Sequence, residues 1–282
     1  IDSLIAVLKD KGEDVRYAAA GALGRQSNLS DTAIDSLIAV LKDKDWKVRV
    51  TAAEALGCQS NLSDTAIDSL ITVLKDEDED IRDAAAGALR RQSNLSDTAI
   101  DSLIAVLKDK DWKVRDIAIG ALWIHPNLSD TAIDSIIVVL KDEDWKVRVT
   151  AAEALGCQSN LYDTAIDSLI AVLKDEGEDV RYAAAGALGR QSNLSDTAID
   201  SLIEVLKDED EEVRDAAAEA LRRQSNLSDT AINSIIAVLK DKDKEVRYAA
   251  ARALGGQSNL SDTAINSLIA VLKDEDKEVR DT

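Results

Sequence analysis

Residues 34–66 read IDSLIAVLKDKDWKVRVTAAEALGCQSNLSDTA, and this stretch decides the fold because the chain repeats it. Its opening block, Ile-Asp/Asn-Ser-Leu/Ile-Ile, returns every 33 residues without an insertion. The copies begin at Ile1, Ile34, Ile67, Ile100, Ile133, Ile166, Ile199, Ile232 and Ile265. A fixed period of about 20–50 residues is typical of a repeat array. We therefore expect one continuous array over residues 1–282, with eight full units in 1–264 and a half unit in 265–282.

Each unit contains two segments with the pattern of an amphipathic helix. With positions counted 1–33 from the first Ile, positions 32 and 33 and the next positions 1–9 form a first helix, whose apolar side chains share one broad arc. Ser30 and Asp31 can cap this helix, and Asp45 and Asp111 can cap the second. The second helix reads x-x-Val-Arg-x-x-Ala-Ala-x-Ala-Leu, and Gln-Ser-Asn-Leu makes the turn back. Such hairpins must stack to cover their apolar faces, so the sequence predicts an all-α solenoid of two-helix repeats.

The composition excludes several classes of function. The 34 Lys and Arg against 54 Asp and Glu give a formal net charge of −20, which argues against binding to nucleic acid or to an anionic membrane surface. No apolar run approaches the ~20 residues of a membrane span, and no secretory leader opens the chain. One His and two Cys leave little for metal ligation or nucleophilic catalysis. We expect no cofactor, no metal and no catalytic residue.

The stretch Leu37–Gly57, LIAVLKDKDWKVRVTAAEALG, resembles the HEAT-like repeats of the type named after phycobilisome lyases. It is equally similar to artificial binding proteins designed from such repeats, and the resemblance extends over every unit. The resemblance implies that Asp at position 10 and Arg at position 16, such as Asp43 and Arg49, form a hydrogen-bonded ladder between repeats. It also implies that the second helices line a concave surface and hold the binding residues. The 33-residue length and the Ser-Asn-Leu-Ser-Asp turn depart from the family pattern, which leaves the curvature open.

The differences between copies gather on one side of the second helix. Positions 13, 14, 17, 18, 21, 24 and 25 vary, and at about 100° per residue they fall within about 140° of one another. Free drift of exposed residues predicts variation on the first helix too, yet position 3 is Ser and position 9 is Lys in all nine copies. One-sided variation favours recognition of a partner, with recent copying or artificial assembly of the units as the alternative.

Aromatic residues follow the same side. Seven of the eight lie at varying positions: Trp46, Trp112 and Trp145 at position 13, Trp123 at position 24, and Tyr17, Tyr182 and Tyr248 at position 17. Large aromatic side chains are frequent anchors of protein interfaces. Alternatively, each Trp covers a Leu of the next repeat and only joins neighbours.

The fourth unit departs from the others, because residues 116–126 read DIAIGALWIHP. The sequence predicts an exposed apolar patch there, of the kind that marks partner sites. Its members are Ile117, Trp123 and Ile124, with Trp112 in line and Trp145 one unit away. An equally weighted alternative is that Ile119 and Ile124 fill a packing gap where Pro126 alters the turn.

The varying face carries both signs of charge. Acidic runs such as residues 76–80 lie at the turn between the helices and lack the central Gly and final Glu of an EF-hand loop. Position 25 is Arg in four units, so acids lie at one edge and arginines at the other. This face suits a protein or peptide with basic and apolar groups. The candidate partner-binding residues are Tyr17, Trp46, Val50, Arg91, Trp112, Asp116, Ile117, Trp123, Ile124, Trp145, Val149, Tyr182, Arg190 and Tyr248.

The leading hypothesis is a non-enzymatic protein- or peptide-binding scaffold. A phycobilin lyase-like enzyme or chromophore-protein chaperone is one alternative, and an artificial consensus-like scaffold is another. Other enzymes with HEAT-like folds fit poorly, since the hydroxylases need several His-Glu ligands and His125 is the only histidine. Cys58 and Cys157 stand three units apart, too far for a disulfide, which favours a reducing, cytoplasmic location.

The terminal repeats give one more expectation. The first helix opens at Ile1 without a preceding cap, although solenoids normally end in polar capping repeats. We expect that the array belongs to a longer protein, or that its uncapped end repeats stack end to end on another copy.

Overall fold

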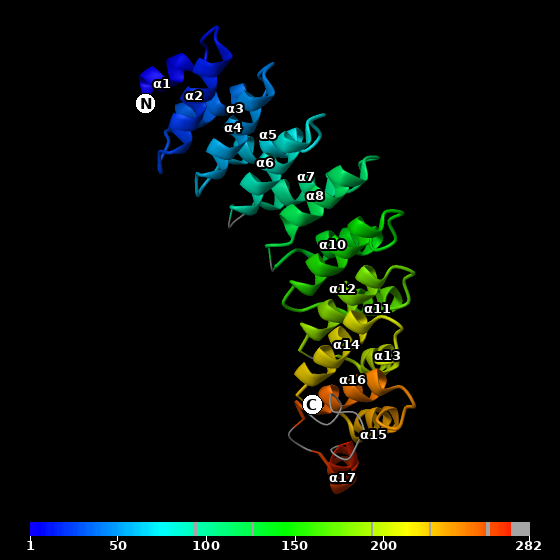
Figure 1. Ribbon diagram of the computed structural model, residues 1–282. Coiled ribbons are helices and arrows are strands. Elements are labelled where there is room, and N and C mark those ends of the chain that lie inside the picture. The colour runs from blue at the N-terminus through cyan, green and yellow to red at the C-terminus, as the bar shows by residue number, and fades with distance from the viewer. Residues whose placement is uncertain (93–94, 126, 193, 226, 258–259, 272–282) are drawn as a thin grey trace. The chain divides into compact units, whose positions relative to one another are not determined.

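The structure is a computed structural model that describes residues 1–92, 95–125, 127–192, 194–225, 227–257 and 260–271. Within these residues the chain forms helices and no strand (Figure 1). The helices are α1 (Asp2–Val7), α2 (Glu13–Gly24), α3 (Asp31–Val40), α4 (Trp46–Gly57), α5 (Asp64–Val73), α6 (Glu79–Arg90), α7 (Asp97–Val106), α8 (Trp112–Leu122), α9 (Asp130–Val139), α10 (Trp145–Gly156), α11 (Asp163–Val172), α12 (Glu178–Gly189), α13 (Asp196–Val205), α14 (Glu211–Arg223), α15 (Asp229–Val238), α16 (Lys244–Leu254) and α17 (Asp262–Val271).

The helices begin at the predicted positions, although the Ser30 side chain makes no capping hydrogen bond to α3 and Asp31 is the first residue of that helix. Asp45 accepts a hydrogen bond from the Val48 amide at 3.3 Å, so α4 begins as expected. Ser63 caps α5 in the same way through the Ala66 amide. The first helices end at position 7, two residues earlier than predicted, because Asp43 donates its amide to the carbonyl three residues back, at Val40. Such bonds tighten the last turn and end a helix.

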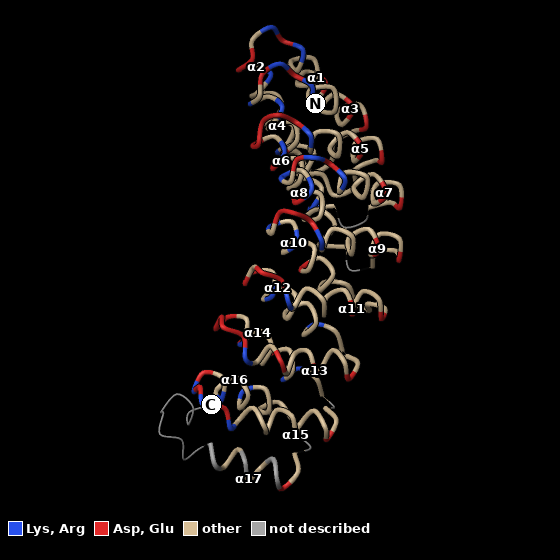
Figure 2. The backbone as a smooth tube through the Cα atoms, turned by 90° about the vertical axis from the view of Figure 1, so that its right-hand side faces the viewer, with Lys and Arg blue, Asp and Glu red and all other residues tan. Residues whose placement is uncertain are grey.

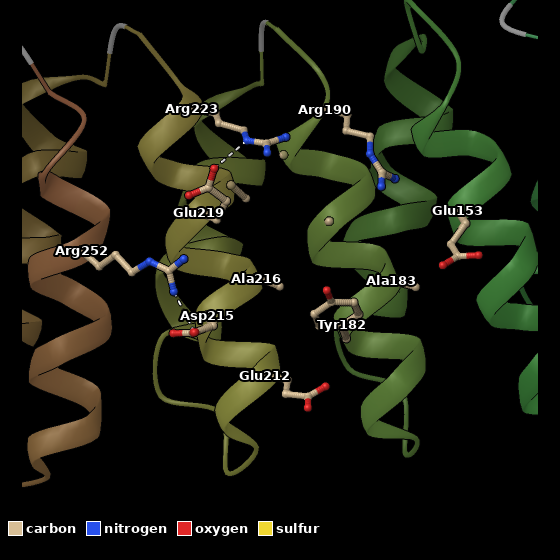
Figure 3. Close-up of a pocket in the computed structure, with 13 residues that line it drawn as sticks. Glu153, Tyr182, Ala183, Arg190, Glu212, Asp215, Ala216, Glu219, Arg223 and Arg252 are labelled. Carbon is tan, nitrogen blue, oxygen red and sulfur yellow. Dashed lines mark hydrogen bonds and ion pairs between the residues drawn. The ribbon is translucent and has the colours of Figure 1, made fainter.

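The chain forms two compact units, Ile1–Ile136 and Ile137–Thr282. Within the first unit, α2, α4, α6 and α8 stack as one layer, and α1, α3, α5 and α7 form the layer beside it. Within the second unit, α10, α12, α14 and α16 form one layer and α11, α13 and α15 form the other. The close view in Figure 3 shows α12 and α14 side by side. Each unit is an α-solenoid, as the repeat predicts.

The constant residues of the second helix form the core. Positions 19 and 23, which are Ala and Leu, are buried in all eight second helices, from Ala19 and Leu23 to Ala250 and Leu254. Charged residues instead gather at the turns that lead into the second helices (Figure 2). The small alanines allow neighbouring second helices to pack more closely than the first helices do. The prediction that constant side chains join successive hairpins is confirmed for this side of the helix.

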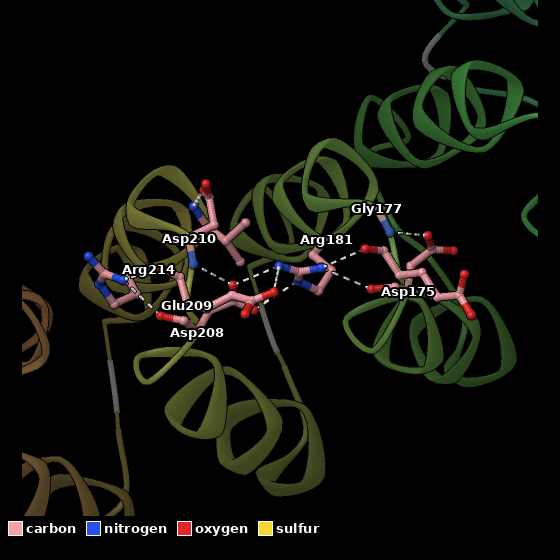
Figure 4. A network of polar contacts seen from close by, with 9 residues as sticks. Asp175, Gly177, Arg181, Asp208, Glu209, Asp210 and Arg214 are labelled. Atoms are coloured by element: carbon pink, nitrogen blue, oxygen red, sulfur yellow. Dashed lines mark hydrogen bonds and ion pairs between the residues drawn. The ribbon is translucent and has the colours of Figure 1, made fainter.

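An arginine ladder crosses the repeats, as the family resemblance implies. Nε and Nη2 of Arg181 each lie 2.8 Å from a carboxylate oxygen of Asp208, and Nη1 donates to the Asp175 carbonyl at 3.0 Å (Figure 4). The pairs Arg16–Asp43, Arg49–Asp76 and Arg148–Asp175 repeat this contact. Hydrogen bonds from Arg16 lower the pKa of Asp43. At these four steps a largely buried ion pair ties one repeat to the next.

The ladder is interrupted at two of the described arginines, Arg82 and Arg214, which bond to their own turns without an ion pair to the next repeat. Within the described residues Arg82 forms no such pair, and Asp109 instead lies 3.5 Å from Nζ of Lys75. Arg82 keeps its bond to the Asp76 carbonyl at 2.8 Å. The arginine at position 16 therefore makes two separate contacts, one with a carbonyl of its own turn and one with the carboxylate of the next repeat. Arg82 keeps the first contact without the second.

A second ladder runs through glutamine at position 26, which the sequence indicated only as part of a turn. Nε2 of Gln191 donates to the Gln158 carbonyl at 3.1 Å, and Oε1 accepts the Leu161 amide at 3.2 Å. Gln59, Gln92, Gln224 and Gln257 make the same bond to the preceding repeat. The sequence feature that could have indicated this ladder is the near-constancy of Gln at position 26, because a surface turn does not require it.

Replacing Arg181 with Lys tests the arginine ladder. We expect a loss of about 1–2 kcal/mol in the free energy of unfolding, because an ammonium cannot reproduce the forked contact to Asp208 and the bond to the Asp175 carbonyl. Urea unfolding followed by circular dichroism measures the change. The matched control is Arg190→Lys, directly after the same helix, where the side chain is exposed and no stability change is expected. Equal stability of the two variants would contradict a structural role for the ladder.

His125 replaces glutamine at position 26 of the fourth unit, and it is buried. Burial lowers its pKa below the ordinary 6.5, so the folded protein favours neutral imidazole. The contribution of His125 to stability is therefore fully present above 6.5 and is lost as the pH drops below it, because the unfolded chain takes up the proton first.

We expect His125→Gln to remove this acid sensitivity. The new amide can donate to the Gln92 carbonyl, as Gln92 does to Gln59 at 2.9 Å, which adds about 1 kcal/mol. Thermal unfolding of both proteins across the pH range measures the effect. An unchanged pH dependence in the variant would show that His125 is not its source.

Candidate binding groove on the second helices

The structure leaves every candidate partner-binding residue at least partly exposed. Exposed fractions reach 42% for Trp46, 44% for Trp145, 45% for Ile124, 49% for Tyr17 and 48% for Tyr182. Arg91 and Arg190 are also exposed. The partly exposed members are Val50, Trp112, Asp116, Ile117, Trp123, Val149 and Tyr248. The varying face is therefore accessible within each unit.

The varying face is narrower than the sequence predicts. At Gly57, Gly156 and Gly189, position 24 is buried in the contact between neighbouring second helices. A Cβ added to Gly156 would lie 2.7 Å from Cα of Ala187 in the next second helix. Position 18 is also buried at Thr51. The prediction that positions 18 and 24 lie on the exposed face is thus wrong at these residues, since the neighbouring helix covers them.

The fourth unit divides between core and surface. Ile119 is fully buried, whereas Ile124 is 45% exposed, so the two do not fill a common gap. Ile117 and Trp123 are partly exposed beside Ile124 in sequence. Pro126 lies outside the described residues. Trp145 belongs to the other compact unit, so the apolar patch of the first unit consists of Ile117, Trp123 and Ile124 with Trp112.

The ammonium group of the following lysine lies over the ring of each tryptophan at position 13. Nζ of Lys47 lies 5.8 Å from the ring centroid of Trp46, and Nζ of Lys146 lies 5.7 Å from that of Trp145. This distance is within the range of a cation–π contact. One face of each indole is thus occupied, and a partner would meet a mixed aromatic and cationic surface there.

A groove of about 520 Å³ lies over the second helices of the second unit (Figure 3). Small residues form its floor, where Ala183, Gly189 and Ala220 are buried and Gly186 leaves open space. The lining residues are Glu153 from α10, Tyr182, Ala183, Gly186, Gly189 and Arg190 from α12, Glu212, Asp215, Ala216, Glu219, Ala220 and Arg223 from α14, and Arg252 from α16. Long polar side chains therefore surround a bare helical floor.

Two acids of the groove are neutralised by arginines of the protein itself. Asp215 lies 2.7 Å from Nη1 of Arg252. Glu219 lies 2.8 Å from Nε of both Arg222 and Arg223. The hydrogen bond from Arg222, with that from Arg223, lowers the pKa of Glu219 to about 2. Glu219 is therefore ionised at neutral pH, and both carboxylates are engaged by arginines of the protein.

Charged side chains lie toward both ends of the groove, and Glu153 lines it on the α10 side. Arg190 and Arg223 stand at the C-terminal ends of α12 and α14, and Glu212 stands near the N-terminal end of α14 (Figure 3). Within the described residues neither Arg190 nor Glu212 forms an ion pair. Tyr182 lies between these ends, with its ring partly exposed. The groove thus presents positive charge, an aromatic surface and negative charge in that order along the helices.

Other kinds of site receive no support from the part of the chain that the structure describes. It contains no group of three His, Cys, Asp or Glu side chains that could hold a metal ion. Its helices are too short or too polar to cross a membrane. No disulfide joins Cys58 and Cys157.

Comparison with known proteins gives one family and a shared fold. The family model of HEAT repeats matches residues 1–90, 34–123, 100–189, 133–222 and 232–282. Among solved structures, an engineered protein aligns with a TM-score of 0.54 and 24% identity, over 99% of this chain and 85% of its own. A chain from a structure of Kap95p binding to RanGDP aligns with a TM-score of 0.64 and 15% identity.

That second alignment covers 99% of this chain but only 44% of the other, so this chain spans less than half its length. At these identities the structural likenesses show the fold alone. No curated protein matches the sequence. The repeated match to the family model extends over most of the chain and agrees with the two-helix repeats of both units. The chain belongs to the HEAT repeat family.

Proposed function

We propose that this protein is a non-enzymatic scaffold that binds a protein or peptide on the varying face of its second helices. One observation carries the proposal: all groove-lining residues except Ala220 stand at positions that differ between repeats. A surface shaped only by packing would be lined by the constant residues. The core and ladder residues instead stay the same in nearly all repeats, whereas the exposed residues that line the groove vary.

The constant residues already account for the fold. The arginine and glutamine ladders join the repeats through bonds such as Arg181 to Asp208 and Gln191 to the Gln158 carbonyl. Ser36 donates its hydroxyl to the Thr32 carbonyl at 2.7 Å, which gives the constant Ser of the first helix a structural role. Variation on the second helix has no comparable structural explanation at the exposed groove positions Glu212 and Arg190. Recognition of a partner explains it.

The groove suits a peptide or a protein segment better than a small metabolite. It is open along the helices and its floor is backbone, alanine and glycine, with Tyr182 as the one aromatic side chain. Its charged side chains surround this floor and do not form part of it. Extended segments can place side chains over such a floor while their charged residues reach the rims.

Selection from a displayed library of random linear peptides tests the proposal. We expect enriched peptides whose affinity falls about tenfold in Tyr182→Ala, because the exposed ring is the aromatic anchor of the groove. The matched control is Tyr17→Ala, at the same repeat position and with 49% exposure but outside this groove. Failure to enrich any peptide, or equal effects of the two variants, would contradict a binding role for this groove.

A further inference from the structure

The charge balance of the groove defines what its occupant must carry. Toward the C-terminal ends of α12 and α14, three arginines, Arg190, Arg222 and Arg223, stand against two carboxylates, Glu153 and Glu219. Both Arg222 and Arg223 contact Glu219 at 2.8 Å. That end keeps an excess of positive charge although the chain as a whole is at −20. Guanidinium groups bind carboxylates through paired hydrogen bonds. An acidic group of the partner is therefore suited to the arginine end.

The opposite end of the groove has the opposite requirement. Glu212 is exposed, and within the described residues it forms no ion pair. Glu211 precedes it at the start of α14, and in the part of the chain that the structure describes neither acid has an ion pair. A Lys or Arg of the partner is suited to this end, whereas a second acidic group would be repelled.

The separation of the two ends fixes the length of the occupant. Glu212 and Arg223 stand eleven residues apart on α14, which corresponds to about 16 Å along a helix and returns almost to the same face. An extended chain covers that distance in about five residues. Tyr182, Ala183 and Ala216 lie between the ends, so the middle of the segment meets aromatic and small apolar surface.

We propose that the groove between α12 and α14 binds an extended peptide segment with opposite charges at its two ends. An acidic residue contacts Arg190 and Arg223, a basic residue about five positions away contacts Glu212, and an apolar residue between them packs on Tyr182. This inference rests on the proposed function and adds the partner's chemistry. The net charge of the chain alone would favour a basic partner. The groove instead favours a segment that carries one acidic and one basic residue at a defined spacing.

Synthetic peptides and charge-reversed variants test this proposal. The probe is a short fluorescent peptide with one Asp and one Lys about five positions apart and a Leu between them. Control peptides carry two Asp or two Lys at the same places. We expect the mixed peptide to bind, and each control to bind about tenfold more weakly.

Charge reversal in the protein gives the sharper readout. The variant Arg190→Glu/Arg223→Glu and the variant Glu212→Lys each reverse one end, and each should weaken the mixed peptide about tenfold. The combined variant reverses both ends and should restore binding to within about threefold, because the peptide can bind in the opposite chain direction. A merely structural role of these exposed residues does not predict such rescue.

The outcomes separate this inference from the proposed function. Tightest binding of the two-Lys peptide, or no rescue in the combined variant, would overturn the charge pattern proposed for the partner. Library peptides that need Tyr182 but lack paired charges would overturn it too, and would leave the binding function intact. Absence of any library peptide that needs Tyr182 would overturn both.

Discussion

Gln191→Leu lowers the free energy of unfolding by about 2–5 kcal/mol. The substitution removes the donor to the Gln158 carbonyl and the acceptor of the Leu161 amide, at 3.1 and 3.2 Å. Each of these groups is left without its partner in or near the interior, which costs about 1–3 kcal/mol per group. Leu has a similar volume, so the loss does not arise from a cavity. Urea unfolding measures the change.

Gln26→Leu provides the matched control for this prediction. Gln26 occupies the same repeat position, but its side chain is exposed and only its carbonyl serves the ladder, as acceptor for Gln59 at 2.9 Å. We expect a change within about 0.5 kcal/mol. If both substitutions cost the same, the glutamine side chains contribute little to the joining of repeats.

Gly189→Ala is the second prediction with a large effect, a loss of about 2–3 kcal/mol in the free energy of unfolding. The added Cβ would lie 2.8 Å from both Cα and Cβ of Ala220, on the neighbouring helix. Because Cα belongs to the backbone, the clash can be relieved only by moving the helix, and overpacking of this kind costs about 1–3 kcal/mol or more.

Gly186→Ala, one turn earlier on α12, is expected to have the opposite sign. An added Cβ there meets nothing within 4 Å, so the substitution should stabilise the helix by about 0.5–1 kcal/mol. Thermal unfolding of the two single variants side by side measures the contrast. Stabilisation by Gly189→Ala would show that the helices do not approach as closely as α12 and α14 do in the structure.

The repeat architecture could be predicted from the sequence because the period and the caps act locally. The 33-residue interval separates the hairpins, and Asp45 caps its helix as expected from its place in the turn. The ladder through Arg181 and Asp208 followed from the family resemblance and is confirmed. These features depend on a residue's own helix or on a contact that every repeat shares.

Contacts that depend on the spacing of helices could not be predicted in this way. A projection at about 100° per residue places Gly156 beside the exposed positions, but it does not give the distance to the next helix. Glycine at position 24 was therefore predicted to lie on the exposed varying face, although Gly156 makes room for Ala187. Gln191 was similarly placed in a turn, because its bonds reach the preceding repeat rather than its own.

The candidate site was predicted as a face rather than as a groove. Tyr182 and Arg190 were both expected on the varying side, and the structure places them in one cavity with residues of α14. The pairing of Glu219 with Arg222 and Arg223 could have been found from their spacing of three and four residues on one helix, although the varying face alone did not indicate it. The binding role of the other candidates, such as Trp46 and Ile124, stays a prediction.

Site-specific photo-crosslinking tests the central claim most directly, that partners bind the varying face of the second helices. A photoreactive residue is placed either at Ala216 in the groove or at Asp200, which is exposed on the first helix α13. Each protein is then irradiated with the tightest library-selected peptide. We expect covalent capture of the peptide from position 216 and none from position 200. Capture from position 200 with none from position 216 would contradict it.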